Sequence, residues 1–131
     1  WSARQADAAV VIQGISREYS VTPIPAGPKA GKYIAVFMDR CISGDIAYAI
    51  ADTPYGPFGE VVRFYRAPEA GQIILDAEGK EDTVFTYNAK AHPHLSKGCR
   101  LLISYNTNVW HGDNTPYCYH PRFIRLDLET I

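Results

Sequence analysis

Polar side chains with binding chemistry alternate with alanines along the segment 87–94 (YNAKAHPH). Successive side chains of an extended strand point to opposite faces. One face is then expected to carry Asn88, Lys90, His92 and His94, and the other Ala89 and Ala91. A row of polar groups inside a fold is costly unless it meets water, a ligand or its own members. The segment therefore predicts either a row that binds sugar hydroxyls or tunes a nearby carboxyl, or a hydrogen-bonded network that only stabilises the fold.

A second set of candidate residues follows the next apolar run, in a segment expected to be a polar loop at 106–116. The set comprises Asn106, Asn108, Trp110, His111 and Asp113. An exposed Trp amid amides and acids is typical of a sugar platform, because a sugar ring stacks on the aromatic face while the polar groups bind its hydroxyls. The alternative is that Trp110 folds back over the edge of a sheet. Tyr87 and these amides are the predicted substrate-binding groups.

Glu18 stands at the start of an earlier predicted strand, on one face with Ser20 and Thr22. Glycoside hydrolysis needs two carboxyl groups, one acting as acid and the other as base or nucleophile. Glu18 is therefore a candidate catalytic carboxylate. The alternative is a solvated residue at a strand end, or a partner of Arg17.

Asp39 and Arg40 follow the next apolar strand and occupy the loop that corresponds to 106–116. They are candidate substrate-binding residues, with a simple ion pair between neighbours as the alternative. His92 is the candidate supporting catalytic residue. Because no nucleophile is evident beside it, a serine–histidine type of hydrolase site is not predicted.

The elements that must position these residues all have the pattern of strands. Apolar runs at 18–25, 32–38, 45–51 and 60–65 alternate with turns rich in Pro and Gly, and no window shows a helical period. The pattern restarts after a polar connector at 67–82. Its strands are expected at 83–93, 100–105 and 122–128, and the segment 7–13 is expected to be the tail of a preceding unit.

An internal repeat organises these strands, because several similar residues recur at the same offset of 68. The pairs are Tyr19 and Tyr87, Pro25 and Pro93, Lys32 and Arg100, and Phe37 and Tyr105. A repeated unit of about four short strands is typical of a propeller blade. The predicted organisation is the tail of a blade at 1–14, a complete blade at 15–68, and a connector with a final, incomplete blade of three strands at 69–131. A freestanding β-sandwich is the alternative.

Composition sets further bounds on the function. The chain has 131 residues, is 47% hydrophobic and 21% charged, and has a formal net charge of -1, which is ordinary for a globular protein. Neither nucleic acid nor a membrane is expected as a partner. The cysteines at 41, 99 and 118 are too widely spaced for a zinc site, so no metal site is predicted. They fit one disulfide with a free thiol, or three buried thiols.

Five motifs occur in an order that resembles a known family. They are EYSVTP at 18–23, ADTPYGPF at 51–58, YNAKAHP at 87–93, LISYNTN at 102–108 and PRF at 121–123. The series is similar to the C-terminal part of a largely uncharacterised bacterial family of five-bladed β-propellers, which resembles arabinanase- and furanosidase-type glycoside hydrolases. The resemblance implies an all-β, partial five-bladed propeller of about two blades. It also implies that the remainder of the same propeller domain is a partner. Because the chain opens on Trp1 rather than Met, Trp1 is expected to be a cut site.

The resemblance implies a function in carbohydrate hydrolysis. The chain is expected to be the C-terminal fragment of a glycoside hydrolase acting on a poly- or oligosaccharide, inactive alone, with an extracellular or periplasmic location. In such propellers the catalytic carboxylates lie on the first three blades, so Glu18 is expected to contact substrate rather than to be the nucleophile. His92 matches a last-blade histidine near a bound cation or water. No cofactor is expected beyond a structural cation at the propeller axis. The alternative is a propeller that binds carbohydrate without catalysis, or a structural interaction domain.

Overall fold

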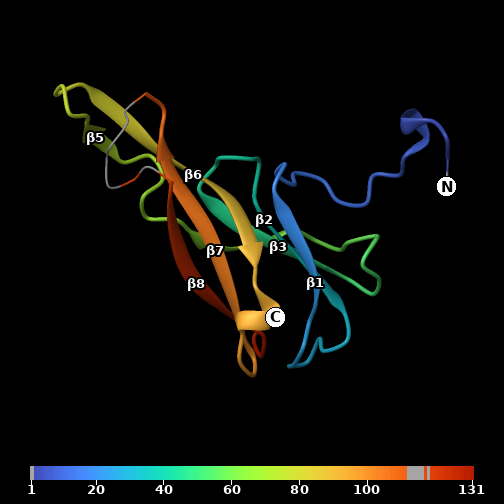
Figure 1. Ribbon diagram of the computed structural model, residues 1–131. Coiled ribbons are helices and arrows are strands. Elements are labelled where there is room, and N and C mark those ends of the chain that lie inside the picture. Colours follow the sequence, from blue (N-terminus) through green and yellow to red (C-terminus); the bar gives the residue numbers. More distant parts are fainter. Residues whose placement is uncertain (1, 112–116, 118) are drawn as a thin grey trace.

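The computed structural model describes residues 2–111, 117 and 119–131, and within them the chain is all-β (Figure 1). Two four-stranded antiparallel sheets follow one another along the chain. The first contains β1 (Tyr19–Pro23), β2 (Tyr33–Met38), β3 (Asp45–Ala51) and β4 (Val62–Arg66), and the second contains β5 (Ile73–Leu75), β6 (Glu81–Ala91), β7 (Arg100–Val109) and β8 (His120–Asp127). The helical elements are two three-residue 3₁₀ turns, η1 (Gln5–Asp7) and η2 (Pro93–Leu95). The prediction of an all-β chain is confirmed.

The first sheet is a simple meander whose two central strands are apolar on both faces. β2 and β3 are buried along nearly their whole length, as the continuous apolar runs YIAVFM and DIAYAIA require. The turn between β1 and β2 passes close to the end of the second sheet. Gly27 lies there with φ +84, and a Cβ on it would come within 2.5 Å of the carbonyl oxygen of Leu128. Only glycine fits this approach, so the turn fixes the two sheets against each other.

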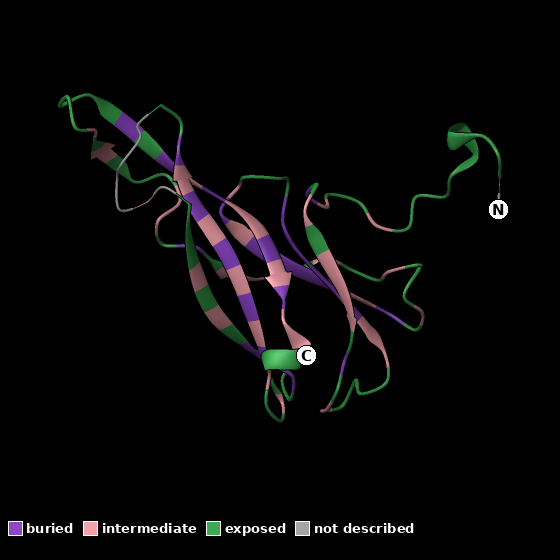
Figure 2. Cartoon of the chain, in the orientation of Figure 1, coloured by how far each residue is buried: buried purple, intermediate pink, exposed green. Residues whose placement is uncertain are grey.

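The two sheets pack face to face through one shared core. Ile34, Val36 and Met38 of β2 lie in the same buried cluster as Leu101 and Ile103 of β7. Each fully buried aliphatic side chain of this kind contributes roughly 1.5–3 kcal/mol to folding. Figure 2 shows the resulting pattern, with buried and half-buried residues alternating along β6 and β7. One face of the second sheet is therefore core, and its other face is turned away from the first sheet.

The other face of the first sheet is covered by the N-terminal segment rather than by strands. Ile12 and Ile15 pack with Phe58 on the buried Phe37, and the N–H of Phe58 donates to the carbonyl oxygen of Val11 at 3.0 Å. The segment 7–13, expected as the tail of a preceding unit, contains no strand.

Residues related by the 68-residue repeat face the same way along the succession of sheets. Phe37 of β2 faces the N-terminal segment, and its counterpart Tyr105 of β7 faces the first sheet. Equivalent positions thus point toward whatever precedes them in the chain. The same offset relates Ile34, Val36 and Met38 to Leu102, Ser104 and Asn106. The aliphatic side chains that the first sheet buries against its successor are therefore largely replaced by polar ones on the second sheet.

The second sheet differs from its prediction in two places. The connector 67–82 was expected to be polar and irregular, but β5 lies within it and pairs with 81–83, so this sheet has four strands and not three. The segment at 106–109 was expected to be a loop, but β7 continues through it. No helix among the described residues is long and apolar enough to cross a lipid bilayer.

Candidate functional site

A β-bulge at Asn88 decides which side chains share a face of the second sheet. Tyr87 pairs with Asn106, and the next pair is Lys90 with Ser104, so two residues of β6 oppose one of β7. Asn88 has φ 58, in the left-handed region that Asn tolerates better than most residues. The extra residue reverses the alternation, placing Ala89 in the core and Tyr87 on the same face as Lys90.

The prediction that four polar residues share one face is therefore wrong for two of them. Lys90 and His92 remain on one face, but His94 belongs to η2. Asn88 is the bulge residue itself, and its Oδ1 is buried without a hydrogen-bond partner among the described residues. The alanines at 89 and 91 do lie on the core side, as expected.

The face turned away from the first sheet is called the outer face here. It is formed by alternate residues of β6 and β7 and by His92, which directly follows β6. The strand residues are Phe85, Tyr87, Lys90, Leu102, Ser104, Asn106 and Asn108. On β8, Phe123 lies opposite Ser104 and Arg125 opposite Leu102. The outer face thus combines aromatic, amide and cationic groups.

Three aromatic rings form a strip at one end of the outer face. The ring centroids of Phe85 and Trp110 are 4.4 Å apart, and those of Phe85 and Tyr87 are 5.7 Å apart. Trp110 remains 53% exposed. It therefore packs one side on Phe85 and offers much of its surface to solvent, which combines the two arrangements expected from the sequence. Asp113, expected in the same loop, lies outside the described residues.

The amides of β7 stand across from these rings. Asn106 and Asn108 belong to the strand and not to a loop, opposite Tyr87 and Phe85 respectively. The side chain of Asn106 hydrogen-bonds the Tyr87 phenol, while Oδ1 of Asn108 accepts the N–H of Val109 at 2.9 Å. The two predicted amides and the predicted tyrosine are thus gathered on one surface.

Glu18 lies close enough to Tyr87 to act on it electrostatically. Burial raises the pKa of the Tyr87 phenol, and electrostatic repulsion by the Glu18 carboxylate and, once ionised, by Tyr119 raises it further. β1 also touches β6 directly, because the N–H of Ala91 donates to Oγ of Ser20 at 2.8 Å. The structure therefore brings the candidate carboxylate to the edge of the outer face.

Asp82 is a site residue that the sequence did not reveal. Its side chain is only 2% exposed. Its oxygens accept the N–H groups of Trp110 at 3.1 Å and His111 at 2.8 Å, besides that of Thr83 at 2.7 Å. His111 Nδ1 lies 3.5 Å from the same carboxylate. A buried carboxylate thus fixes the backbone of the segment that carries Trp110. An Asp before an apolar run gives no signal of this role, since its partners are 28 and 29 residues away.

His92 does have a hydroxyl beside it, contrary to the expectation from the sequence. Its Nε2 lies 2.7 Å from Oγ of Ser104. Burial lowers the pKa of His92, and the positive charges of His94 and Lys90 lower it further, so the ring is neutral near pH 7. Among the described residues His92 contacts Ser104 and His94 but no carboxylate. These residues therefore do not supply the carboxylate of a catalytic triad.

Asp39 and Arg40 do not join the outer face and do not pair with each other. The Asp39 carboxylate is buried and accepts a hydrogen bond from Nε of Arg63 at 2.7 Å. Arg40 is exposed with φ 48, and its N–H donates to the carbonyl oxygen of Gly14 at 2.9 Å. Both residues therefore tie the loop between β2 and β3 to other parts of the first sheet and to the N-terminal segment.

The described residues contain no cluster of three or more His, Cys, Asp or Glu side chains that could hold a metal ion. Cys41 is an exposed free thiol, which rules out three buried thiols. Cys99 is also free and half-buried, and its Sγ donates to Glu129 Oε1 at 2.7 Å. Cys118 lies outside the described residues.

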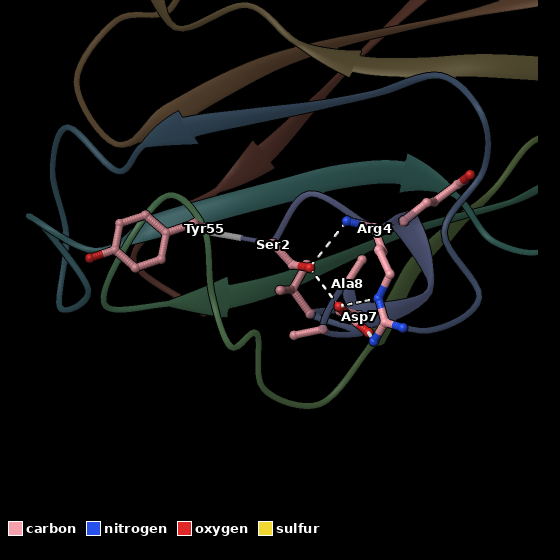
Figure 3. A pocket seen from close by; sticks show the side chains of 8 residues that line it. Ser2, Arg4, Asp7, Ala8 and Tyr55 are labelled. Carbon is pink, nitrogen blue, oxygen red and sulfur yellow. Dashed lines mark hydrogen bonds and ion pairs between the residues drawn. The ribbon is translucent and has the colours of Figure 1, made fainter.

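A large open hollow of about 1040 Å³ lies beside the N-terminal segment, against Tyr55 (Figure 3). Its polar groups bind one another, because the Asp7 carboxylate accepts from Ser2 at 2.6 Å and from Arg4 at 2.7 and 3.0 Å. These hydrogen bonds lower the pKa of Asp7. None of the residues predicted for a site lines this hollow.

The fold and the outer face define a two-sheet, all-β protein with an exposed aromatic and amide surface. The chain belongs to the family described as "Domain of unknown function (DUF5005)", whose family model matches residues 1–127. No curated protein and no solved structure matches the chain significantly.

Proposed function

We propose that the chain binds a poly- or oligosaccharide on its outer face, as the substrate-binding part of a glycoside hydrolase-like β-propeller. The observation that carries this proposal is the half-exposed Trp110 stacked on Phe85, with Tyr87 and Asn106 joined by a hydrogen bond beside it. An aromatic ring takes the apolar face of a sugar, and neighbouring amide and phenol groups take its hydroxyls.

A propeller is the arrangement that best accounts for the repeat. Two four-stranded meanders follow one another, and their equivalent residues face the same way around the succession of sheets. Such a succession is completed by further blades. The remaining blades of the same domain are the partner that this proposal requires, and they must leave the outer face open to the ligand.

The composition of the outer face favours a ligand over simple blade packing. The first sheet presents Ile34, Val36 and Met38 to its neighbour and buries them completely. At the repeat-equivalent positions the second sheet presents Ser104 and Asn106, which lose hydrogen bonds to water if an apolar sheet covers them. A sugar can replace those hydrogen bonds, so ligand binding explains the substitution.

Glu18 is proposed as a group that contacts substrate rather than as one of a catalytic pair. It lies near Tyr87 at the edge of the outer face. Asp82, the other carboxylate near the aromatic strip, is bound to three backbone N–H groups. Hydrolysis needs two free carboxyl groups about 5–10 Å apart, which the other blades would supply.

The experiment is a titration of the protein with arabino- and xylo-oligosaccharides, comparing wild type with Trp110→Ala and Asn106→Ala. Loss of one stacking ring costs about 1–2 kcal/mol, so Trp110→Ala should weaken binding roughly five- to thirtyfold. The control is Tyr55→Ala, because Tyr55 is another exposed aromatic (74%) and lies beside the N-terminal hollow. Unchanged affinity in Trp110→Ala would mean that the sugar does not bind on the aromatic strip, whereas no binding by the wild type would favour a structural interaction domain.

A further inference from the structure

We propose that the ligand of the outer face is an acidic glycan, whose carboxylate or sulfate groups bind in a basic hollow at the end of the face opposite to Trp110. This inference rests on the proposed function and names its substrate class. The basic hollow has a volume of about 370 Å³ and lies between η2, β7 and β8. Its lining residues are Leu95, Ser96, Lys97, Arg100, Leu102 and Arg125.

The three cations of the basic hollow have no carboxylate partner within ion-pair distance among the described residues. Lys97, Arg100 and Arg125 form no ion pair with any described residue. Several other arginines do: the side chains of Arg4, Arg63, Arg66 and Arg122 each lie within 3.1 Å of a carboxylate oxygen. The carboxylate nearest in register is Asp127, which lies across from Arg100, and its Oδ1 accepts the N–H of Glu129 instead.

The polar atoms around the cations are already engaged. Oγ of Ser96 donates to the carbonyl oxygen of His92 and accepts the N–H of Leu102, both at 2.8 Å. The hollow therefore offers guanidinium and ammonium groups as its free donors. Guanidinium groups bind carboxylate, sulfate and phosphate oxygens in pairs of parallel hydrogen bonds, which favours an anionic ligand over a neutral one.

The basic hollow is continuous with the outer face. Leu102 belongs to both, and Arg125 lies directly opposite it on β8. Along β7 the distance from Asn108 to Arg100 is eight residues, or about 26 Å. Lys90 lies between these ends, opposite Ser104, and adds a further positive charge. An extended oligosaccharide on the aromatic strip can therefore reach the basic hollow while passing Lys90.

Charge differs between the two ends of this path. The rings of Phe85, Tyr87 and Trp110 at one end of the path carry no charge near pH 7. The cations at the other end attract a negative sugar substituent. We therefore expect neutral faces of the ligand on Trp110 and its acidic groups near Arg100 and Arg125.

The test compares three probes on the same protein: hexagalacturonic acid, the same hexasaccharide with its carboxyl groups reduced to alcohols, and a sulfated neutral hexasaccharide. We expect the acidic probes to bind roughly three- to tenfold more tightly than the reduced one at low salt. This preference should shrink as sodium chloride rises from 50 to 300 mM, because salt screens exposed charges. A preference of the sulfated probe over the uronate, or the reverse, identifies the source of the anion.

The decisive variant is Arg100→Gln with Arg125→Gln, checked for an unchanged circular dichroism spectrum. It should lose most of the preference for the acidic probes over the reduced one, and Arg100→Lys with Arg125→Lys should restore part of that preference. Arg40→Gln is the matched control, because Arg40 is an exposed cation in the loop between β2 and β3 and does not lie on the outer face. Equal affinity of wild type for acidic and reduced probes, or an unchanged preference in the double Gln variant, would overturn the inference.

Trp110→Ala separates this inference from the proposed function. If that variant loses affinity for the reduced probe while wild type shows no acidic preference, only the acidic substrate class is wrong. If it binds every probe as wild type does while the double Gln variant loses the acidic preference, the basic hollow is an anion site and the aromatic platform is wrong.

Discussion

The buried carboxylate of Asp82 accepts the backbone N–H of Trp110 at 3.1 Å, and this hydrogen bond holds the half-exposed tryptophan where its ring can stack on Phe85. The same carboxylate accepts the N–H of His111 at 2.8 Å. The start of β6 and the end of β7 are thereby tied together by one side chain. The platform proposed for sugar binding depends on a residue that does not touch the ligand.

Asp82→Asn should loosen this segment without removing the ring. Replacing one carboxylate oxygen by an NH₂ group leaves a backbone N–H facing a donor, which should cost about 1–3 kcal/mol of the free energy of unfolding. In a Trp1→Phe background Trp110 is the only tryptophan, so its fluorescence reports the platform directly. We expect a shifted emission maximum and stronger acrylamide quenching in Asp82→Asn.

The matched control for this prediction is Glu81→Gln, since Glu81 is the exposed neighbour of Asp82 in the same strand. It should leave both the emission and the free energy of unfolding unchanged. An Asp82→Asn protein with the wild-type spectrum would show that Asp82 does not position Trp110.

Glu69 lies in the connector between the two sheets and forms two hydrogen bonds with the second sheet. Its two oxygens accept hydrogen bonds from the Tyr105 hydroxyl at 2.9 Å and from Nε of Arg122 at 3.1 Å. Glu69→Ala removes the carboxylate that accepts the hydrogen bond of the buried Tyr105 hydroxyl, and we expect a loss of roughly 1–3 kcal/mol in urea unfolding. Tyr105→Phe should make the same substitution less costly, because the hydroxyl that Glu69 accepts is then already absent.

The Glu69 prediction is controlled by Glu78→Ala, which removes a surface carboxylate 3.9 Å from Lys80 and should change stability by less than about 0.5 kcal/mol. Additive losses in Glu69→Ala and Tyr105→Phe would contradict a direct coupling. The pKa of Tyr105 offers a second measurement, because burial and Glu69 both raise it. Ultraviolet titration should therefore show that Tyr105→Phe removes one of the tyrosines that stay protonated above pH 10.

Asn88 occupies a left-handed backbone conformation at the bulge, with φ 58. Asn88→Val should destabilise the protein by about 1–2 kcal/mol, because a side chain branched at Cβ is strained there. Asn88→Gly should be neutral or slightly stabilising, since glycine accepts the conformation and removes a buried Oδ1 that has no partner among the described residues. Thermal unfolding measures both, and a Val variant as stable as wild type would mean that the bulge is absent.

We expect the protein to lose stability in mild acid because of His92. Burial and the neighbouring cations lower its pKa below 6.5, so the unfolded chain binds the proton more readily than the folded one. Stability should be complete above pH 6.5 and fall as the pH drops toward the lowered folded value. His92→Gln should reduce this dependence in unfolding measured from pH 7.5 to 5, whereas His120→Gln, at an exposed position, should retain it.

The strands with continuous apolar runs could be predicted closely from the sequence. The run DIAYAIA is β3 residue for residue, and the run at 32–38 differs from β2 by one residue. These strands are predictable because burial on both faces requires a continuous apolar run, and because glycine and proline mark the ends of each run.

The candidate site was harder to predict because its geometry depends on tertiary structure. The Tyr87, Asn106 and Trp110 cluster was expected, but the alternation that placed Asn88 beside Lys90 fails at a bulge occupied by Asn rather than by the glycine that usually signals one. The polar residues Asn106 and Asn108 suggested a loop, yet they belong to a strand and lie on its outer face. Asp82 gave no signal at all, because its hydrogen bonds join distant parts of the chain.

The most direct test of sugar binding on the outer face is a crystal structure of the full-length protein soaked with the oligosaccharide that it binds most tightly. The account predicts a sugar ring stacked on Trp110, with the amide of Asn106 within hydrogen-bonding distance of a hydroxyl. A sugar bound elsewhere, with Trp110 and Phe85 covered by another part of the protein, would contradict it.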